Sequence, residues 1–132
     1  MFKGVGTLEI QKLVGFDRIF QAECFPDEVR KMFGKNTGEM SRYIKWLYTW
    51  LSVLDREGMK ALSLEQFEHI KNTSNPNLYA IRHPHSQINE RYLYIYADGE
   101  SAILLTAFKE KSTSDYQSAI TRAEHIYAEL ED

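Results

Sequence analysis

The feature that most constrains the fold is a hairpin pattern in the second half of the chain. Two runs dense in Ile, Leu, Tyr and Phe, Arg91–Tyr96 and Ala102–Phe108, flank the dipeptide Asp98-Gly99. Aspartate and glycine both tolerate the positive φ that a two-residue type I′ turn requires. Leu78–Arg82 has the composition of a further short strand. This part of the chain therefore predicts a three-stranded antiparallel meander.

Two helical patterns precede the meander. Pro26 and the two acidic residues after it favour the first turn of a helix over 26–33, and Gly34 ends that helix. Apolar residues then recur at intervals of three and four over 39–57, which is the period of a helix with one buried face. Gly58 ends this second helix.

The remaining segments give shorter patterns. Apolar and polar residues alternate over Phe16–Phe25, which predicts a strand, and Gly15 could turn this strand back on the segment before it. Residues 63–66 have the sequence of a capping box and predict a short helix. A similar pattern beginning at Ser114 predicts a terminal helix.

The order of these elements predicts an α+β domain. Strands joined by short turns pair antiparallel, so we expect an antiparallel sheet of about four strands. Helices 26–33 and 39–57 then pack on one face, and the terminal helix completes the fold. The 132 residues suit one domain over 1–132, and no internal repeat or long linker divides the chain.

Composition limits the compartment. The single cysteine, Cys24, excludes an internal disulfide and fits a reducing environment. No apolar signal segment follows the first residues, and no apolar run approaches the roughly 20 residues that span a bilayer. We therefore expect a cytoplasmic protein with no membrane partner.

Charge is unevenly distributed along the chain. The net charge is −3, so no overall basic field indicates nucleic-acid binding. Between residues 30 and 45, however, a single acid, Glu39, stands among several cations, which are Arg30, Lys31, Lys35, Arg42 and Lys45. The last residues are acidic. This pattern fits either a basic patch or two solvated helix faces.

At the meander the sequence resembles a known family. Leu-Tyr-Ala-Ile-Arg at 78–82, Glu-Arg-Tyr-Leu-Tyr at 90–94 and Leu-Leu-Thr-Ala-Phe-Lys-Glu-Lys at 104–111, followed by Tyr116 and a helix, resemble the RelE/HigB superfamily of toxins. Within it, the phage-derived HigB-like branch is the most similar, and the resemblance covers 78–127. It implies a small RelE-like fold and a messenger-RNA endoribonuclease, usually acting in the ribosome, that needs no metal or other cofactor. It also implies a cognate antitoxin, typically a small helix-turn-helix protein.

The resemblance also implies site residues. Arg91 corresponds to the family's phosphate-binding arginine, and Arg82 to a basic residue that ends the preceding strand. Lys109 and Lys111 correspond to the basic cluster after the last strand, of which Lys109 is expected in catalysis and Lys111 in RNA binding. Tyr116 corresponds to a tyrosine that stacks on a base or assists proton transfer. The chain departs from the family pattern at Glu110 and Glu90.

His83 and His85 bracket Pro84 in a polar loop and are candidate RNA-binding residues. Either imidazole could act as a general base near neutral pH. The loop supplies no third ligand, so the two histidines do not predict a zinc site.

Each candidate residue also has a structural interpretation. Arg91 could form a surface ion pair with Glu90, and Tyr116 could pack on the sheet. The lysines could discourage edge pairing, and the three tyrosines of the 91–96 strand could form a packing ladder. The alternative function is accordingly a non-catalytic, phage-derived interaction module of the same fold.

Overall fold

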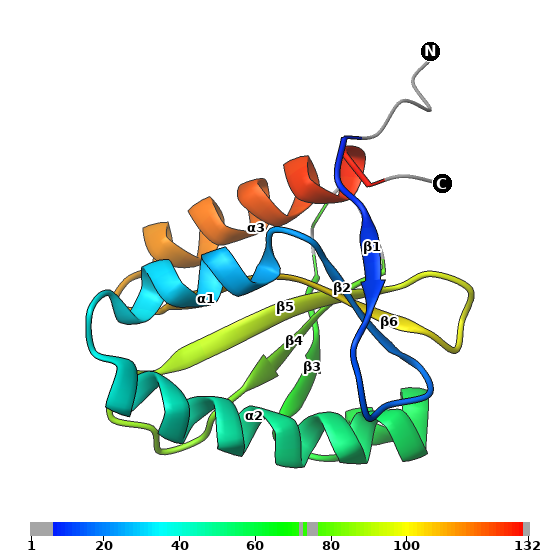
Figure 1. Ribbon diagram of the computed structural model, residues 1–132, viewed down its shortest axis with the longest axis horizontal. Helices are drawn as coiled ribbons and strands as arrows, with labels where there is room; N and C mark the ends of the chain where they lie inside the picture. The colour runs from blue at the N-terminus through cyan, green and yellow to red at the C-terminus, as the bar shows by residue number, and fades with distance from the viewer. Residues whose placement is uncertain (1–6, 72, 74–76, 131–132) are drawn as a thin grey trace.

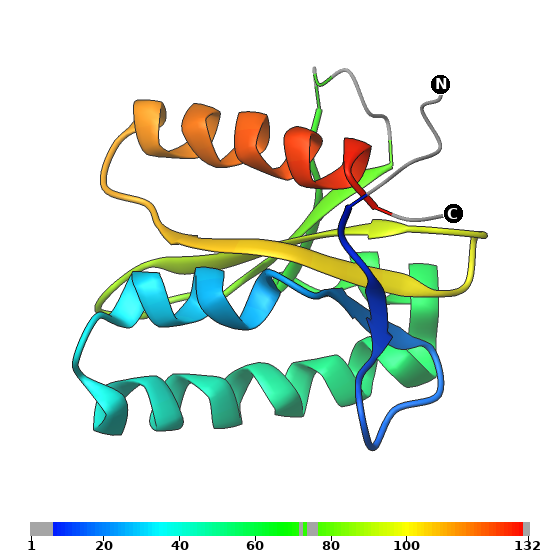
Figure 2. The same cartoon turned by 45° about the horizontal axis from the view of Figure 1, so that its top comes forward.

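The computed structural model describes residues 7–71, 73 and 77–130. It is a three-layer arrangement with a central sheet, two helices on one face and one helix on the other (Figures 1 and 2). The strands lie in the order β1-β2-β6-β5-β4-β3. In chain order the elements are β1 Ile10–Lys12, β2 Ile19–Ala22, α1 Phe25–Phe33, α2 Thr37–Glu57, the 3₁₀ helix η1 Gly58–Ser63, β3 Phe67–His69, β4 Leu78–Arg82, β5 Glu90–Tyr96, β6 Ala102–Lys109 and α3 Thr113–Ala128.

The α+β class, the meander and both long helices are confirmed, but the sheet is larger than expected. It has six strands, and β2 pairs parallel to β6 while the other neighbours pair antiparallel. β2 and β6 are far apart in sequence, so no local signal indicated their pairing. β2 covers only Ala102–Leu104 of β6. The last residues of β6 therefore have no strand partner on that side.

Strand alternation divides the apolar residues into two cores. The core beneath α1 and α2 contains Leu47, Leu51 and the ring ladder of Tyr92, Tyr94 and Tyr96. The core beneath α3 contains other residues of the same strands together with one face of that helix, among them Leu93, Ile95, Leu105, Ala119 and Ala123. The three tyrosines are at most 7% exposed, so they form a packing ladder rather than an open stacking surface.

The helix ends follow the sequence signals. Gly34 and Gly58 cap α1 and α2 with φ of 60° and 58°, a region that suits glycine. The Asn36 side chain accepts a hydrogen bond from the Glu39 N–H at 2.9 Å. α3 begins slightly earlier than expected, because Ser112 rather than Ser114 is the N-cap and forms a capping box with Asp115.

Two local predictions were wrong. The hairpin loop runs from Ala97 to Ser101 rather than through a two-residue type I′ turn, since Asp98 does not have positive φ and instead accepts hydrogen bonds from two following N–H groups. Those bonds lower the pKa of Asp98. The capping pattern at 63–66 does not start a helix. It leads into β3, whose backbone is satisfied by pairing with β4, so tertiary pairing overrode the local signal.

The short strand before α1 is also confirmed in part. Within the expected Phe16–Phe25 segment, Ile19–Ala22 forms β2, and β1 pairs with it antiparallel through a turn at Gly15, whose φ is 96°. Phe25 already belongs to α1.

In the described part of the chain, no helix is both long and apolar enough to cross a membrane.

Candidate functional site

Most of the predicted site residues gather at one end of the sheet. β4 and β6 finish there, β5 begins there, and the connection between α1 and α2 and the start of α3 lie at the same end, on the left in Figure 1. We call this region the sheet end. Because successive residues of a strand point to opposite faces, the sheet end has two sides. One side lies under α3 and the other under α1 and α2.

On the α3 side, Arg91 is held between two carboxylates. Its Nη1 donates to Glu68 Oε1 at 2.8 Å, and its Nε lies 2.6 Å from Glu110 Oε1, an ion pair without hydrogen-bond alignment. The guanidinium carbon lies 5.2 Å from the centre of the Tyr116 ring. The Tyr116 hydroxyl donates to the same Glu68 oxygen at 2.9 Å. These four residues form the Arg91 cluster.

The Arg91 cluster neutralises its own cation. The Arg91 side chain is only 13% exposed, and two nearby carboxylates outweigh its single charge. Burial, followed by the charge of Glu68 and the hydrogen bond to it, raises the pKa of Tyr116 well above its ordinary value. The phenol therefore stays protonated near neutral pH, where it can donate a hydrogen bond but cannot accept a proton as phenolate.

Arg82 lies beside this cluster. It pairs directly with Arg91 across β4 and β5, so both side chains leave the sheet on the α3 side. Its backbone N–H donates to the Gln66 carbonyl at 2.8 Å. Both arginines lie at strand ends, because Arg82 is the last residue of β4 and Arg91 the second of β5.

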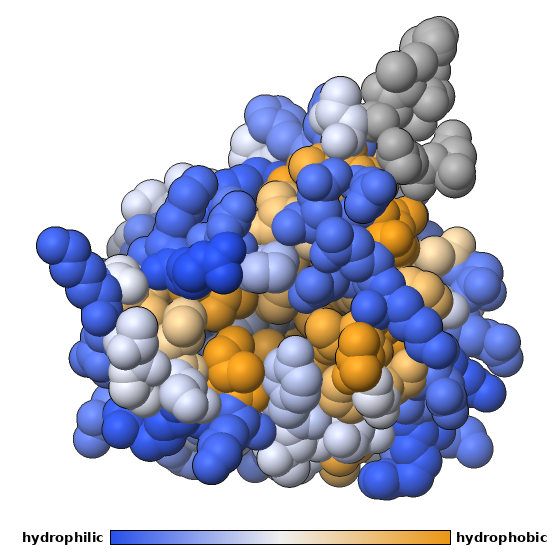
Figure 3. All heavy atoms as spheres, in the orientation of Figure 1, coloured by the Kyte–Doolittle hydropathy of each residue, from blue (hydrophilic) through white to orange (hydrophobic). Residues whose placement is uncertain are grey.

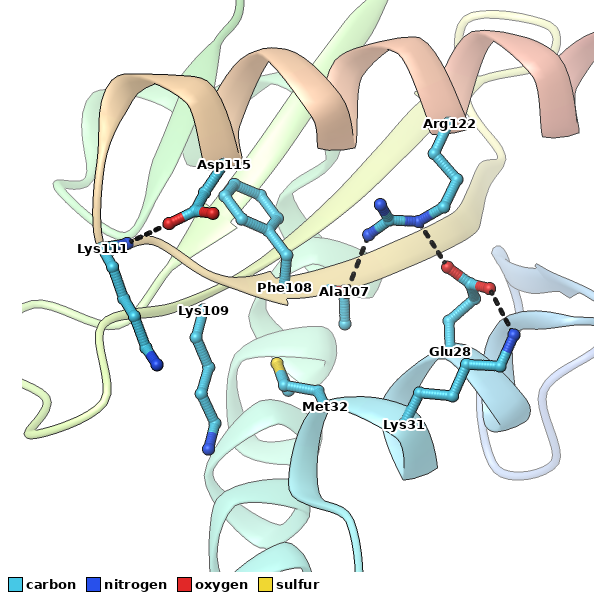
Figure 4. A pocket seen from close by; sticks show the side chains of 9 residues that line it. All are labelled: Glu28, Lys31, Met32, Ala107, Phe108, Lys109, Lys111, Asp115 and Arg122. Atoms are coloured by element: carbon cyan, nitrogen blue, oxygen red, sulfur yellow. Dashed lines mark hydrogen bonds and ion pairs between the residues drawn. The ribbon is translucent and has the colours of Figure 1, made fainter.

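The open half of β6 forms a groove between α1 and α3. Its volume is about 470 Å³, and Figure 4 shows the side chains that line it. Arg122 reaches across, with Nε 2.8 Å from Glu28 Oε1 and Nη2 3.4 Å from the Ala107 carbonyl oxygen. Thr106 donates to Glu28 as well, at 2.5 Å. Sequence reasoning did not single out Glu28 or Arg122, because their contact depends on two helices meeting over one strand.

The predicted lysines line the same groove. Lys109 and Lys111 extend from the end of β6 in Figure 4, and neither amino group forms an ion pair with a carboxylate of the described residues. The Lys109 amino group lies 5.7 Å from the centre of the Phe33 ring. Lys31, from the basic run seen in the sequence, lies 3.9 Å from Glu28.

On the α1/α2 side, His83 pairs with a buried carboxylate. Its Nδ1 lies 2.6 Å from Glu90 Oε2, and Glu90 is fully buried. The Ser86 hydroxyl donates to the other Glu90 oxygen at 2.5 Å. The imidazole ring stacks on Trp46 with 3.7 Å between ring centres and 9° between planes. These residues form the His83 cluster.

Glu90 does not pair with its sequence neighbour Arg91. The two point to opposite faces, so the surface ion pair considered for them does not form, and Arg91 pairs with more distant acids. His85 lies in the same loop as His83 but is exposed, with φ of 63°. The structure therefore separates the two histidines, and only His83 joins a carboxylate.

Exposed cations surround the sheet end. Figure 3 shows a largely hydrophilic surface in this view, with apolar side chains visible between α1 and α2. Several residues of the basic run, Lys35, Arg42 and Lys45, are exposed, as is Lys111. Arg42 also lies 5.3 Å from the centre of the Tyr43 ring. The protein is acidic overall, yet several of these exposed cations lie close together at the sheet end.

The chain belongs to the family of phage-derived proteins described as Gp49-like (DUF891), whose family model matches residues 22–128. This family is associated with RelE/HigB-like toxins. No curated protein sequence matches the chain significantly. Among the described residues, no group of three His, Cys, Asp or Glu side chains is placed to hold a metal ion.

Proposed function

We propose that the protein is the toxin component of a type II toxin–antitoxin pair and acts as a metal-independent endoribonuclease on messenger RNA. Membership of the Gp49-like family supports a toxin–antitoxin context. The observation that carries the proposal is the pair of lysines at the sheet end, since Lys109 and Lys111 form no ion pair with a carboxylate of the described residues. An RNA backbone needs such unpaired cations along its path.

The proposed reaction is attack of a ribose 2′-hydroxyl on the adjacent phosphate. Negative charge then builds on the phosphoryl oxygens, and fixed cations stabilise it. Lys109 and Lys111 hold the RNA backbone, and Arg82 approaches from the neighbouring strand. Arg91 can meet a phosphate only by exchanging Glu68 or Glu110 for it. Tyr116 contributes a ring face or a hydrogen-bond donor.

The direct test is cleavage of a defined messenger RNA by the purified protein, with and without ribosomes. We expect fragments that end in a 2′,3′-cyclic phosphate, an undiminished rate in EDTA, and growth arrest when the protein is induced. A double substitution, Lys109→Ala with Lys111→Ala, should weaken cleavage and reduce its dependence on salt. Lys60→Ala, an exposed lysine of η1, is the matched control. Activity that EDTA abolishes and zinc restores would overturn the proposal.

The proposal includes a cognate antitoxin of the small helix-turn-helix type that covers the sheet end. Co-expression of the protein with the product of an adjacent small reading frame should give a stable complex and relieve growth arrest. Separate elution of every neighbouring product would contradict this part.

One observation favours the second candidate, a non-catalytic interaction module. The arginine expected to bind phosphate is already neutralised by Glu68 and Glu110. A protein that neither arrests growth nor cleaves RNA, on or off the ribosome, but forms a stable complex with a neighbouring gene product would establish this alternative.

A further inference from the structure

Resting on the proposed ribonuclease function, we infer that His83 is the proton acceptor for the attacking 2′-hydroxyl and that Glu90 is its positioning residue. The inference comes from the His83 cluster, which lies on the opposite side of the sheet from Arg91. The sequence offers both His83 and His85 as a possible general base, and of the two the structure brings a carboxylate only to His83.

The contact with Glu90 determines which imidazole nitrogen carries the proton. A carboxylate only accepts hydrogen bonds, so Nδ1, at 2.6 Å from Glu90 Oε2, must be the N–H donor. The lone pair of a neutral imidazole then resides on Nε2. No hydrogen bond joins Nε2 to another described residue. The ring therefore presents an available base on the atom that Glu90 does not use.

The ring is also fixed in place while it remains accessible. Stacking on Trp46 at 3.7 Å and an edge contact with Tyr43 at 5.7 Å restrict its rotation. Its side chain keeps 19% of its surface exposed. A fixed, partly exposed imidazole is suited to act as a general base, which must come within hydrogen-bond distance of the proton it takes.

Glu90 has the features of a positioning residue. It is fully buried, and the nearest groups are Ser86 at 2.5 Å, His83, and the Tyr92 hydroxyl at the outer limit of 3.5 Å. No lysine or arginine of the described residues pairs with it. Burial of a carboxylate with so few partners is costly. The positive charge that His83 gains on accepting a proton would lie directly beside this carboxylate and offset that cost.

Cations suited to the scissile phosphate lie on the same side of the sheet. Lys109 is the cross-strand partner of Glu90, so both side chains leave the sheet toward α1 and α2. The Lys109 amino group lies over Phe33, which stacks on Tyr43 at 5.6 Å, and Tyr43 in turn contacts His83. Arg42 lies over the Tyr43 ring. A phosphate near Lys109 and a ribose near Nε2 would thus share one surface.

The step is balanced in protons and bonds. The 2′-hydroxyl proton passes to Nε2 as O2′ forms a bond to phosphorus, and the bond from phosphorus to O5′ breaks. O5′ leaves with a proton from water, and the imidazolium returns its proton to solvent. The products are a 2′,3′-cyclic phosphate and a 5′-hydroxyl.

The experiment compares His83→Asn and Glu90→Gln with wild type over a range of pH, using a fixed messenger RNA. Asparagine keeps a donor close to the Nδ1 position but has no basic lone pair, so we expect a loss of about 10²–10⁴-fold. The acid limb of the wild-type pH profile should vanish in His83→Asn and shift in Glu90→Gln. His125→Asn makes the same change on the exposed surface of α3 and should leave rate and profile unchanged.

Several titratable groups face His83 and belong in the interpretation of the pH profile. They are Glu90 and Tyr92 from β5 and Tyr43 from α2, with Arg42 beyond Tyr43 and Lys109 across the strand pair. Burial raises the pKa of Tyr92 far above neutral, so that phenol stays protonated. A purely structural role for His83 would change the rate through unfolding, which thermal melting detects, but would leave the profile intact.

A second measurement does not depend on activity or on the variants folding. Nitrogen NMR of the His83 imidazole in the wild-type protein should show the Nδ1–H tautomer, and the Nε2–H tautomer would overturn the inference. If wild type cleaves RNA and folded His83→Asn does so equally well, the inference falls while the proposed function stands. If wild type cleaves no RNA, both fall.

Discussion

The Arg91 cluster and the His83 cluster are built around two neighbouring residues of opposite charge, Arg91 and Glu90. Arg91 and Glu90 are adjacent in β5, but the strand sends one toward α3 and the other toward α1 and α2. On the α3 side a cation is enclosed by two carboxylates and a phenol. On the other side an anion is enclosed by an imidazole and neutral donors. On the α3 side the charge of Arg91 is fully neutralised by its partners. On the other side the Nε2 atom of His83 keeps a lone pair that no described residue uses.

This difference suggests that the Arg91 cluster mainly stabilises the fold and that the His83 cluster mainly serves the proposed reaction. The Arg91 cluster joins β3, β5, the end of β6 and α3, so it fastens four elements together. The His83 cluster fastens one loop to β5 and α2 and keeps part of its ring at the surface. We therefore expect changes in the Arg91 cluster to affect folding first, and changes in the His83 cluster to affect activity first.

The largest expected effect is on stability, from Arg91→Ala. It leaves Glu68 and Glu110 without their shared cation. Breaking a buried ion pair costs about 3–5 kcal/mol, and because the Glu68 side chain is 35% exposed the loss should lie near the lower end of that range. Urea denaturation should show this loss in the free energy of unfolding. Arg91→Lys keeps the charge but loses the two-pronged contact, so its loss should be smaller. A stability unchanged from wild type would show that Arg91 does not fasten these elements.

Ser86→Ala tests how much the His83 cluster contributes to stability. It removes one donor from the buried Glu90 carboxylate, and a hydrogen bond to a charged group contributes about 2 kcal/mol. The decrease in the free energy of unfolding should be smaller for Ser86→Ala than for Arg91→Ala, because the Arg91 cluster joins more elements than the His83 cluster does. Urea midpoints for both variants, measured together with Ser118→Ala on the exposed surface of α3, decide this order.

Glu110→Gln tests whether Arg91 can bind an RNA phosphate once one of its two carboxylate partners is removed. It removes one of the two charges that occupy the guanidinium, so RNA binding should tighten by about tenfold, or about 1.4 kcal/mol. The slope of affinity against salt should grow as well, because one more cation reaches the phosphates. Glu100→Gln, in the exposed loop between β5 and β6, is the control. Weaker binding in Glu110→Gln would mean that Arg91 serves structure alone.

The smallest effect concerns Tyr116→Phe. The lost hydrogen bond to Glu68 contributes about 1 kcal/mol near neutral pH. Because the folded protein raises the pKa of Tyr116 above its ordinary value of 10.0, its contribution is complete below that pH and is lost as pH rises toward the folded value. Denaturation series from neutral to alkaline pH should show a shallower decline for Tyr116→Phe. An identical decline in both proteins would contradict the assignment.

Much of this architecture followed from the sequence. Local signals gave the ends of α1 and α2 at Gly34 and Gly58 and located the strands β4, β5 and β6 closely. Period-two alternation along β5 is enough to put Arg91 on the face of Leu93 and Ile95, and the structure has it on that face. These features depend on residues a few positions apart, whose backbone preferences and side-chain directions act before any tertiary contact forms.

Tertiary structure alone decided the partners within the sheet end. Glu68 reaches Arg91 because 67–69 forms an edge strand on β4, against a local helix signal. Glu110 reaches it from the end of β6, and Glu90 is buried because the loop after β4 folds His83 and Ser86 over it. Sequence patterns fix the face on which a side chain emerges. Which charged residue becomes the partner of that side chain depends on strand pairing and helix packing between distant segments. The free energy for that pairing and packing comes from burying the two cores as a whole.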